Sequence, residues 1–160
     1  MPGRVWVRFF CGILSMTALG ATAPLAAGDG RAADKPQSED LQRVQGKWEL
    51  VVSQDLKENG VRRAVKEIKG SRETVTFWGD DGKVLRAHTV EIKVTKNGDL
   101  HVFTYSNMEV IDGQEKGAKQ AGPNSYVYRA DDEAFYEILG LLPGEEKQPV
   151  IVREWKRVKG

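Results

Sequence analysis

The sequence predicts an all-β protein in which about eight antiparallel strands, joined in chain order, curl into an up-and-down barrel with one or two short helices. From Trp48 onward, apolar and polar residues alternate with a period of two, as in half-buried strands. These runs are rich in Val, Thr, Tyr, Phe and Trp, which favour pleated surfaces. Turn residues separate neighbouring runs and indicate hairpins. A closed barrel protects the sheet edges, and a flattened sandwich is the alternative.

The first residues differ in character from the rest of the chain. Arg4 and Arg8 precede an uncharged apolar run that extends from Phe9 to Gly28 and ends in small residues. This pattern is typical of a secretory signal peptide, which we place at residues 1–27. The protein is therefore expected to be secreted or periplasmic. An uncleaved leader that anchors the chain in a membrane is the alternative.

The remainder divides into a polar spacer, residues 28–40, and one domain, residues 41–158. Lys and Arg number 24 against 23 Asp and Glu, and this balance argues against nucleic acid or a membrane surface as the main partner of the domain. The one cysteine, Cys11, lies in the leader. Removal of the leader would leave no disulfide and no thiolate nucleophile.

The domain begins with a short helical turn that Ser38 can cap. The next strand places Trp48, Leu50 and Val52 on one face. Helical spacing of Val61, Val65 and Ile68 then predicts a helix over 61–70, with a solvated basic face formed by Arg62, Arg63, Lys66 and Lys69.

Strands follow in which Val75 and Phe77 share one face, and in which Val84, His88, Val90, Ile92 and Val94 share another. Asn97-Gly98 predicts a type I′ hairpin that pairs Lys96 with Asp99. Asp80-Asp81-Gly82 and Asp131-Asp132-Glu133 mark two further hairpins. The segment 108–124 reads as a loop with one short strand over 108–111. Three final strands lie in the runs SYVYRA, AFYEIL and VIVREWKRV.

No sequence pattern indicates an enzyme, so we expect no catalytic residues, metal or cofactor. The chain has no G-x-S-x-G motif, phosphate-binding glycine loop or calcium loop. The acidic pairs lie in expected turns, where water would screen them; they are Asp80-Asp81, Asp131-Asp132-Glu133 and Glu145-Glu146. His88 and His101 are expected to lie far apart, with His88 in the core or a cavity and His101 exposed.

The aromatic residues of the strands suggest a binding function. A barrel interior that combines rings with a few polar groups suits a small hydrophobic or amphipathic ligand. The candidate ligand-binding residues are His88, Arg86, Tyr126, Tyr128 and Phe103, and an ordinary packed core is the alternative explanation of the aromatic residues. The alternative function is a protein-interaction or cell-envelope module with a filled barrel and an unidentified protein partner.

Several motifs resemble known proteins over most of the domain. LQRVQGKWEL at its start, KEIKGSRETVTFWGDDGKV, SYVYRADDEAFYEIL and the closing REWKRV resemble the lipocalin-like (calycin) barrels. They are most similar to an uncharacterised domain family of secreted planctomycete proteins. The resemblance implies a barrel floor made by Gly46, Trp48 and Arg157, with Arg153 as the competing partner of Trp48. A guanidinium packs well on an indole face.

Overall fold

The computed structural model describes residues 38–145 and 147–159. The predicted signal peptide at residues 1–27 lies outside these residues, as does most of the predicted spacer. Ser38, Glu39 and Asp40, the last residues of that spacer, belong to the first helix and its cap. Among the described residues, no helix is long and apolar enough to cross a membrane.

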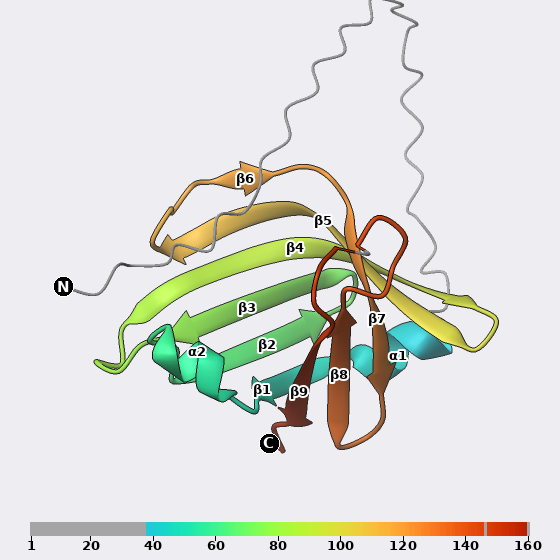
Figure 1. Cartoon of the computed structure of the whole chain (residues 1–160), viewed down its shortest axis with the longest axis horizontal. Coiled ribbons are helices and arrows are strands. Elements are labelled where there is room, and N and C mark those ends of the chain that lie inside the picture. The colour runs from blue at the N-terminus through green and yellow to red at the C-terminus, as the bar shows by residue number, and fades with distance from the viewer. Residues whose placement is uncertain (1–37, 146, 160) are drawn as a thin grey trace, which may run out of the picture. The chain divides into compact units, whose positions relative to one another are not determined.

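Two short helices and nine strands make up the described part of the chain (Figure 1). The helices are α1 (Glu39–Val44) and α2 (Gln54–Glu58). The strands are β1 (Gly46–Leu50), β2 (Arg63–Lys69), β3 (Arg72–Trp78), β4 (Val84–Asn97), β5 (Leu100–Gly113), β6 (Lys119–Gln120), β7 (Asn124–Ala130), β8 (Ala134–Leu139) and β9 (Ile151–Arg157).

Eight of these strands form a closed antiparallel barrel, as the sequence predicts. The sheet order is β4-β3-β2-β1-β9-β8-β7-β5-β6, and the pairing of β4 with β5 closes the ring. The two-residue strand β6 pairs only with β5 and lies outside the ring (Figure 1). The first and last barrel strands meet where Trp48 pairs with Arg157.

Helix α1 forms where the sequence predicts it and lies at one end of the barrel. Oγ of Ser38 accepts a hydrogen bond from the backbone N–H of Leu41 at 3.3 Å, and two acidic residues occupy the first turn. The Gln45 side chain donates to the carbonyl of Gly70 and accepts from its N–H. These bonds join the end of α1 to the β2–β3 turn.

The predicted helix over 61–70 is wrong, because this segment contains strand β2. Ala64, Lys66 and Ile68 alternate into the interior, and β2 pairs along its length with β3 and in part with β1. The helical spacing of Val61, Val65 and Ile68 arises by coincidence, and ladder pairing on both sides overrides it. The expected solvated basic face is also wrong, since Lys66 is 1% exposed.

All three predicted hairpins occur, but the β4–β5 turn differs in type and register. Gly98 has φ 59°, while Asn97 and Asp99 have negative φ, which fits a type II′ turn rather than type I′. Asn97 therefore pairs with Leu100, and Lys96 pairs with His101 instead of Asp99. The expected loop over 108–124 is corrected as well, since β5 continues to Gly113 and β6 follows.

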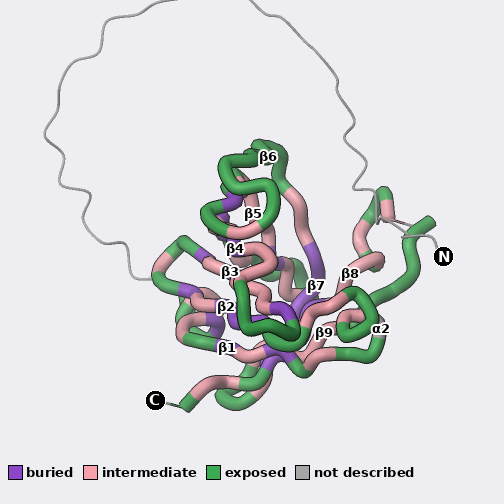
Figure 2. Tube along the Cα trace, turned by 90° about the vertical axis from the view of Figure 1, so that its left-hand side faces the viewer, coloured by how far each residue is buried: buried purple, intermediate pink, exposed green. Residues whose placement is uncertain are grey.

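The two ends of the barrel have different connections. At the end near α1, short turns join β2 to β3, β4 to β5 and β7 to β8. At the opposite end, longer segments join β1 to β2, β5 to β7 and β8 to β9, and α2 lies in the first of these. Figure 2 shows exposed chain at β6 and stretches of buried chain in β1 and β7. We refer to the end near α1 as the closed end and to the opposite end as the open end.

Candidate ligand site in the barrel interior

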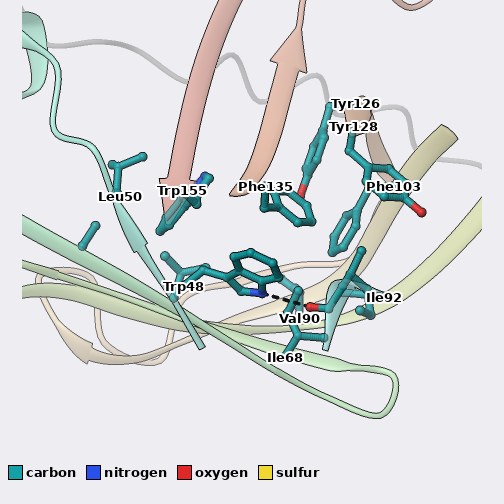
Figure 3. Packing of buried hydrophobic residues seen from close by; sticks show 13 residues of the cluster. Trp48, Leu50, Ile68, Val90, Ile92, Phe103, Tyr126, Tyr128, Phe135 and Trp155 are labelled. Carbon is teal, nitrogen blue, oxygen red and sulfur yellow. Dashed lines mark hydrogen bonds between the residues drawn. The ribbon is translucent and has the colours of Figure 1, made fainter. Parts of the chain in front are cut away.

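Trp48 seals the closed end. Its side chain is fully buried, and its indole N–H donates to the carbonyl of Val44 at 3.0 Å (Figure 3). The guanidinium carbon of Arg157 lies 3.9 Å from the centre of the ring. Arg157 therefore stacks on Trp48, whereas Arg153 lies four residues earlier in β9, opposite Glu137.

Arg157 also satisfies backbone carbonyls that would otherwise lack partners. Its guanidinium donates to the carbonyls of Asp132 at 2.7 Å, Gln45 at 2.8 Å and Arg43 at 3.1 Å. Gly46 has φ 110°, and a Cβ placed there would lie 2.9 Å from this guanidinium. Glycine at position 46 thus provides both the backbone conformation and the space that the arginine occupies.

Aromatic rings fill the interior directly above this seal. The rings of Phe103 and Tyr126 stack with their centres 4.9 Å apart, and those of Tyr128 and Phe135 stack at 5.6 Å (Figure 3). The ring centres of Trp48 and Phe135 lie 5.7 Å apart. All five side chains are buried, so this half of the barrel is a packed core.

A cluster of buried charges lies above the rings, and we call it the ion cluster. Nζ of Lys66 contacts Oε1 of Glu73 at 3.0 Å, forms an ion pair with Glu137, and donates to the hydroxyl of Tyr126 at 3.3 Å. Arg153 lies 3.7 Å from the other oxygen of Glu137. Lys66, Glu73 and Glu137 are each at most 5% exposed, so removal of one partner would leave an uncompensated buried charge.

Burial and pairing act on the ion cluster in opposite directions. Burial alone lowers the pKa of Lys66, but Glu137 and Glu73 outweigh it and the net pKa is raised. Burial raises the pKa of Glu73, and Lys66 only partly offsets this. Burial, followed by the two carboxylates, holds the pKa of Tyr126 well above its usual value. Lys66 is therefore a cation and Tyr126 a neutral phenol at neutral pH.

Four aromatic rings surround the ammonium group of Lys66. The ring centres of Phe135 and Trp155 lie 4.4 Å and 4.6 Å from Nζ, and those of Phe103 and Tyr126 both lie at 5.6 Å. Cation–π attraction partly replaces the water that a buried ammonium loses. The ion cluster is thus the boundary between the aromatic core and the open half of the barrel.

Beyond the ion cluster, the inward-facing side chains are only partly buried. Phe77, Tyr105 and Leu139 pack against the core but keep some exposure, although their strand alternation directs them inward. The side chain of Arg86 is 31% exposed and that of Arg153 is 36% exposed. Inward-facing side chains near the open end therefore keep some contact with solvent, in contrast to the buried rings at the closed end.

Arg86 and His88 lie on one face of β4 in this open half. His88 stacks on Phe77 with ring centres 6.2 Å apart. Arg86 donates to the sulfur of Met108 at 3.4 Å and lies 3.7 Å from Glu115. Within the described part of the chain, Nε of Arg86 and Nδ1 of His88 are buried atoms with no hydrogen-bond partner.

His88 is uncharged at neutral pH. Burial lowers its pKa to about 4, and the positive charges of Arg86 and Lys66 act in the same direction. A neutral imidazole has one N–H donor and one acceptor nitrogen. The open half therefore presents a neutral hydrogen-bonding ring beside a guanidinium.

The structure separates the predicted ligand-binding residues into two groups. His88 and Arg86 come together in the open half, while Phe103, Tyr126 and Tyr128 lie in the packed core. The sequence-based predictions do not include the ion cluster, although the alternation of inward and outward residues along the strands indicates two of its members. Glu73 shares the inward face of Val75 and Phe77, and Glu137 shares that of Phe135 and Leu139. Lys66 is missed because a helix is expected over 61–70.

His101 lies at the closed end and is half-buried rather than exposed as expected. Its Nδ1 is 3.3 Å from Asp40, and its ring meets that of Tyr128 edge-on. It borders a hollow of about 430 Å³ between α1, the β4–β5 turn and the β7–β8 turn. The lining of this hollow carries ionisable side chains of both signs, and Tyr128 belongs both to the lining and to the core.

The acidic clusters serve the turns in which they were predicted. Asp131 accepts hydrogen bonds from the backbone N–H groups of Glu133 and Ala134, and Asp80 pairs with Arg62. Glu145 accepts from the N–H groups of Gly140 and Leu142. Among the described residues, no group of three or more His, Cys, Asp or Glu side chains is arranged to hold a metal ion.

The fold and its interior define the class of protein as a closed eight-stranded antiparallel β-barrel, consistent with a lipocalin-like barrel. Comparisons of the chain with family models, curated proteins and solved structures found no match.

Proposed function

We propose that this protein binds a small amphipathic ligand in the open half of its barrel. The observation that carries the proposal is the partial exposure of inward-facing side chains beside buried polar atoms that have no partner. Unpaired buried polar atoms are costly, and a ligand that supplies their hydrogen bonds would gain affinity.

The lining of the open half matches such a ligand in its chemical composition. Phe77, Tyr105 and Leu139 offer apolar surface. Arg86 and His88 offer a few directed polar atoms among them. Binding sites for small molecules combine these two features, with apolar contacts for affinity and few polar groups for orientation.

Two neighbouring residues of β8 provide a matched test. Leu139 faces inward and pairs with Ile151, whereas Ile138 faces outward and pairs with Val127 and Val152. Leu139→Gln should weaken binding of a neutral fluorescent dye such as Nile red by roughly fivefold or more, since it places a polar group on the apolar wall. Ile138→Gln should leave dye binding unchanged.

Thermal unfolding of both variants would show that they retain the fold. Equal dye affinities for the wild type and both variants would contradict binding in the interior. Native mass spectrometry of the protein purified from the exported fraction of its own cells would show whether a small molecule is retained.

An interaction module is the second candidate, and exposed apolar residues beside the open end favour it. Val150 just before β9, Ile151 and Val152 at its start, and Leu141 in the preceding loop are each more than 40% exposed. Exposed apolar side chains that are close in sequence suit contact with a protein partner. A co-purifying protein together with a ligand-free chain would support this function instead.

Export and family membership belong to the same proposal. The leader pattern of residues 1–27 supports secretion or transfer to the periplasm. The motifs around Trp48 and Arg157 support a relationship to the uncharacterised planctomycete domain family. The intact mass of the exported protein would test export, since cleavage after residue 27 removes a defined part of the chain.

A further inference from the structure

We propose that the ligand has an uncharged, oxygen-containing polar end, such as an alcohol, ester or amide, and that this end points inward. This inference deepens the proposed function and depends on it. It follows from how the charges of the open half are paired and from the order of chemical layers along the barrel.

Each cation near the open half already faces a carboxylate. Lys66 is held by Glu73 and Glu137, Arg153 lies 3.7 Å from Glu137, and Arg86 lies 3.7 Å from Glu115. The three cations are therefore matched by three carboxylates. An anionic ligand would have to sit beside these carboxylates or displace one of them, and a cationic ligand would meet Lys66 and the two arginines.

The buried N–H groups without described partners are suited to a neutral oxygen; Oε1 of Glu73 also makes no hydrogen bond to a described group, although it forms an ion pair with Lys66. Nε of Arg86 is a buried N–H donor that pairs with no described group, and Nε1 of Trp155 is a second. Nδ1 of His88 is a buried ring nitrogen that also has no described partner. A hydroxyl group both donates and accepts, and a carbonyl oxygen accepts from the N–H groups, without adding charge to the site.

The order of the layers orients the ligand. Along β8 and β9, the inward residues run from Phe135 and Trp155 through Glu137 and Arg153 to Leu139 and Ile151. Apolar core, polar layer and apolar rim therefore follow one another toward the open end. A polar end placed at the middle layer leaves the apolar part of the ligand against Phe77, Leu139 and Ile151.

Three probes that share one alkyl chain test the inference: 1-decanol, decanoate and decylammonium. Each is titrated against the protein loaded with Nile red at neutral pH. We expect decanol to displace the dye with an affinity at least about tenfold higher than either charged probe, since burial of an uncompensated charge is costly.

Substitution of two exposed glutamates, Glu115 just after β5 and Glu109 within it, tests the role of charge pairing. Glu115→Gln removes the carboxylate beside Arg86 and should raise the affinity for decanoate about threefold or more, while the affinity for decanol stays constant. Glu109→Gln removes a carboxylate that pairs with Lys119 and should change neither affinity.

The outcomes separate this inference from the function on which it rests. Tighter or equal binding of decanoate or decylammonium overturns the neutral polar end, while the Leu139 and Ile138 comparison still upholds binding in the interior. A Glu115→Gln variant that behaves like Glu109→Gln overturns the charge-pairing argument. If neither the dye nor any probe binds, the inference and the proposed function both fail.

Discussion

The closed and open halves of the barrel use the same strands for different purposes. At the closed end, Trp48, Arg157 and the stacked rings leave no exposed inward surface, and short turns join the strands. At the open end, Phe77, Arg86 and Leu139 face inward but stay partly exposed, and longer segments join the strands. Both halves contain buried polar atoms without described partners, such as the hydroxyl of Tyr128 in the core and Nε of Arg86 in the open half, so the halves differ in exposure.

The two halves differ in how completely their inward-facing side chains are buried. Rings that contact one another on all sides contribute to the free energy of folding and cannot also contact a ligand. Side chains beyond the ion cluster bury less apolar surface and so contribute less to the free energy of folding. The ion cluster lies between the two halves. The ammonium group of Lys66 lies over the ring of Phe135 and pairs with Glu137, and Glu137 in turn lies 3.7 Å from Arg153.

Loss of the Trp48 ring should give the largest effect. Trp48→Ala removes a fully buried indole and the surface on which Arg157 stacks, and should lower the free energy of unfolding by about 3–5 kcal/mol. Trp78→Ala is the control: Trp78 is half-buried on the outer face of β3 with Arg63 over its ring, and should cost about 1 kcal/mol or less. Urea unfolding measures both values, and a loss below about 1 kcal/mol for Trp48→Ala would show that the closed end depends little on this seal.

The pH dependence of His88 comes next and concerns the open half. The pKa of His88 is about 4 in the folded protein against 6.5 in the unfolded chain, so below pH 6.5 the unfolded state binds a proton that the folded state does not. The stability that neutral His88 provides is complete above pH 6.5 and declines as the pH falls toward 4. Between pH 7.5 and 4.5 the loss should be about 2–3 kcal/mol.

His88→Asn should remove this part of the pH dependence, while the charges that face residue 88, on Arg86, Lys66 and Glu137, stay in place. His101→Asn is the control at the closed end. Urea unfolding at both pH values gives the comparison. An unchanged pH slope in His88→Asn would mean that this imidazole is hydrated in the folded protein.

Two arginines of β9 should give the smallest effect. Arg157→Lys keeps the charge but loses the planar group that stacks on Trp48 and binds three carbonyls, and should cost about 1–2 kcal/mol. Arg153→Lys, at 36% exposure in the open half, should cost less than about 0.5 kcal/mol. Thermal unfolding measures the loss of stability in each variant. Equal losses would show that the arginine at the closed end contributes no more to stability than the one in the open half.

Local signals predicted the barrel well. Period-two alternation, the three hairpin turns and the Ser38 cap all depend on residues close together in sequence, and each appears in the structure. The first inward pair, Trp48 and Leu50, was also readable from the alternation. Such features are set by sterics and hydrogen bonding within a few residues, so the chain specifies them without knowledge of the rest of the fold.

The candidate site was less accessible to sequence reasoning. The sequence pattern identifies Arg86 and His88, but it predicts a helix over 61–70 with Lys66 on a solvated face. The structure has strand β2 there, and Lys66 is buried. Isolated spacing cannot distinguish a helix from a strand when apolar residues satisfy both periods. Pairing with β1 and β3 decides the outcome, and only then does Lys66 face Glu73 and Glu137.

Alternation and turn residues in the chain are enough to predict the class of fold, the positions of the hairpins and the residues able to seal one end. Folding of distant strands onto one another places Lys66 and Glu137, 71 positions apart, in a buried pair, and it gathers the rings in one half of the barrel. The physical reason is that alternation specifies which face a side chain occupies, whereas closure of the ring specifies which side chains meet across the interior.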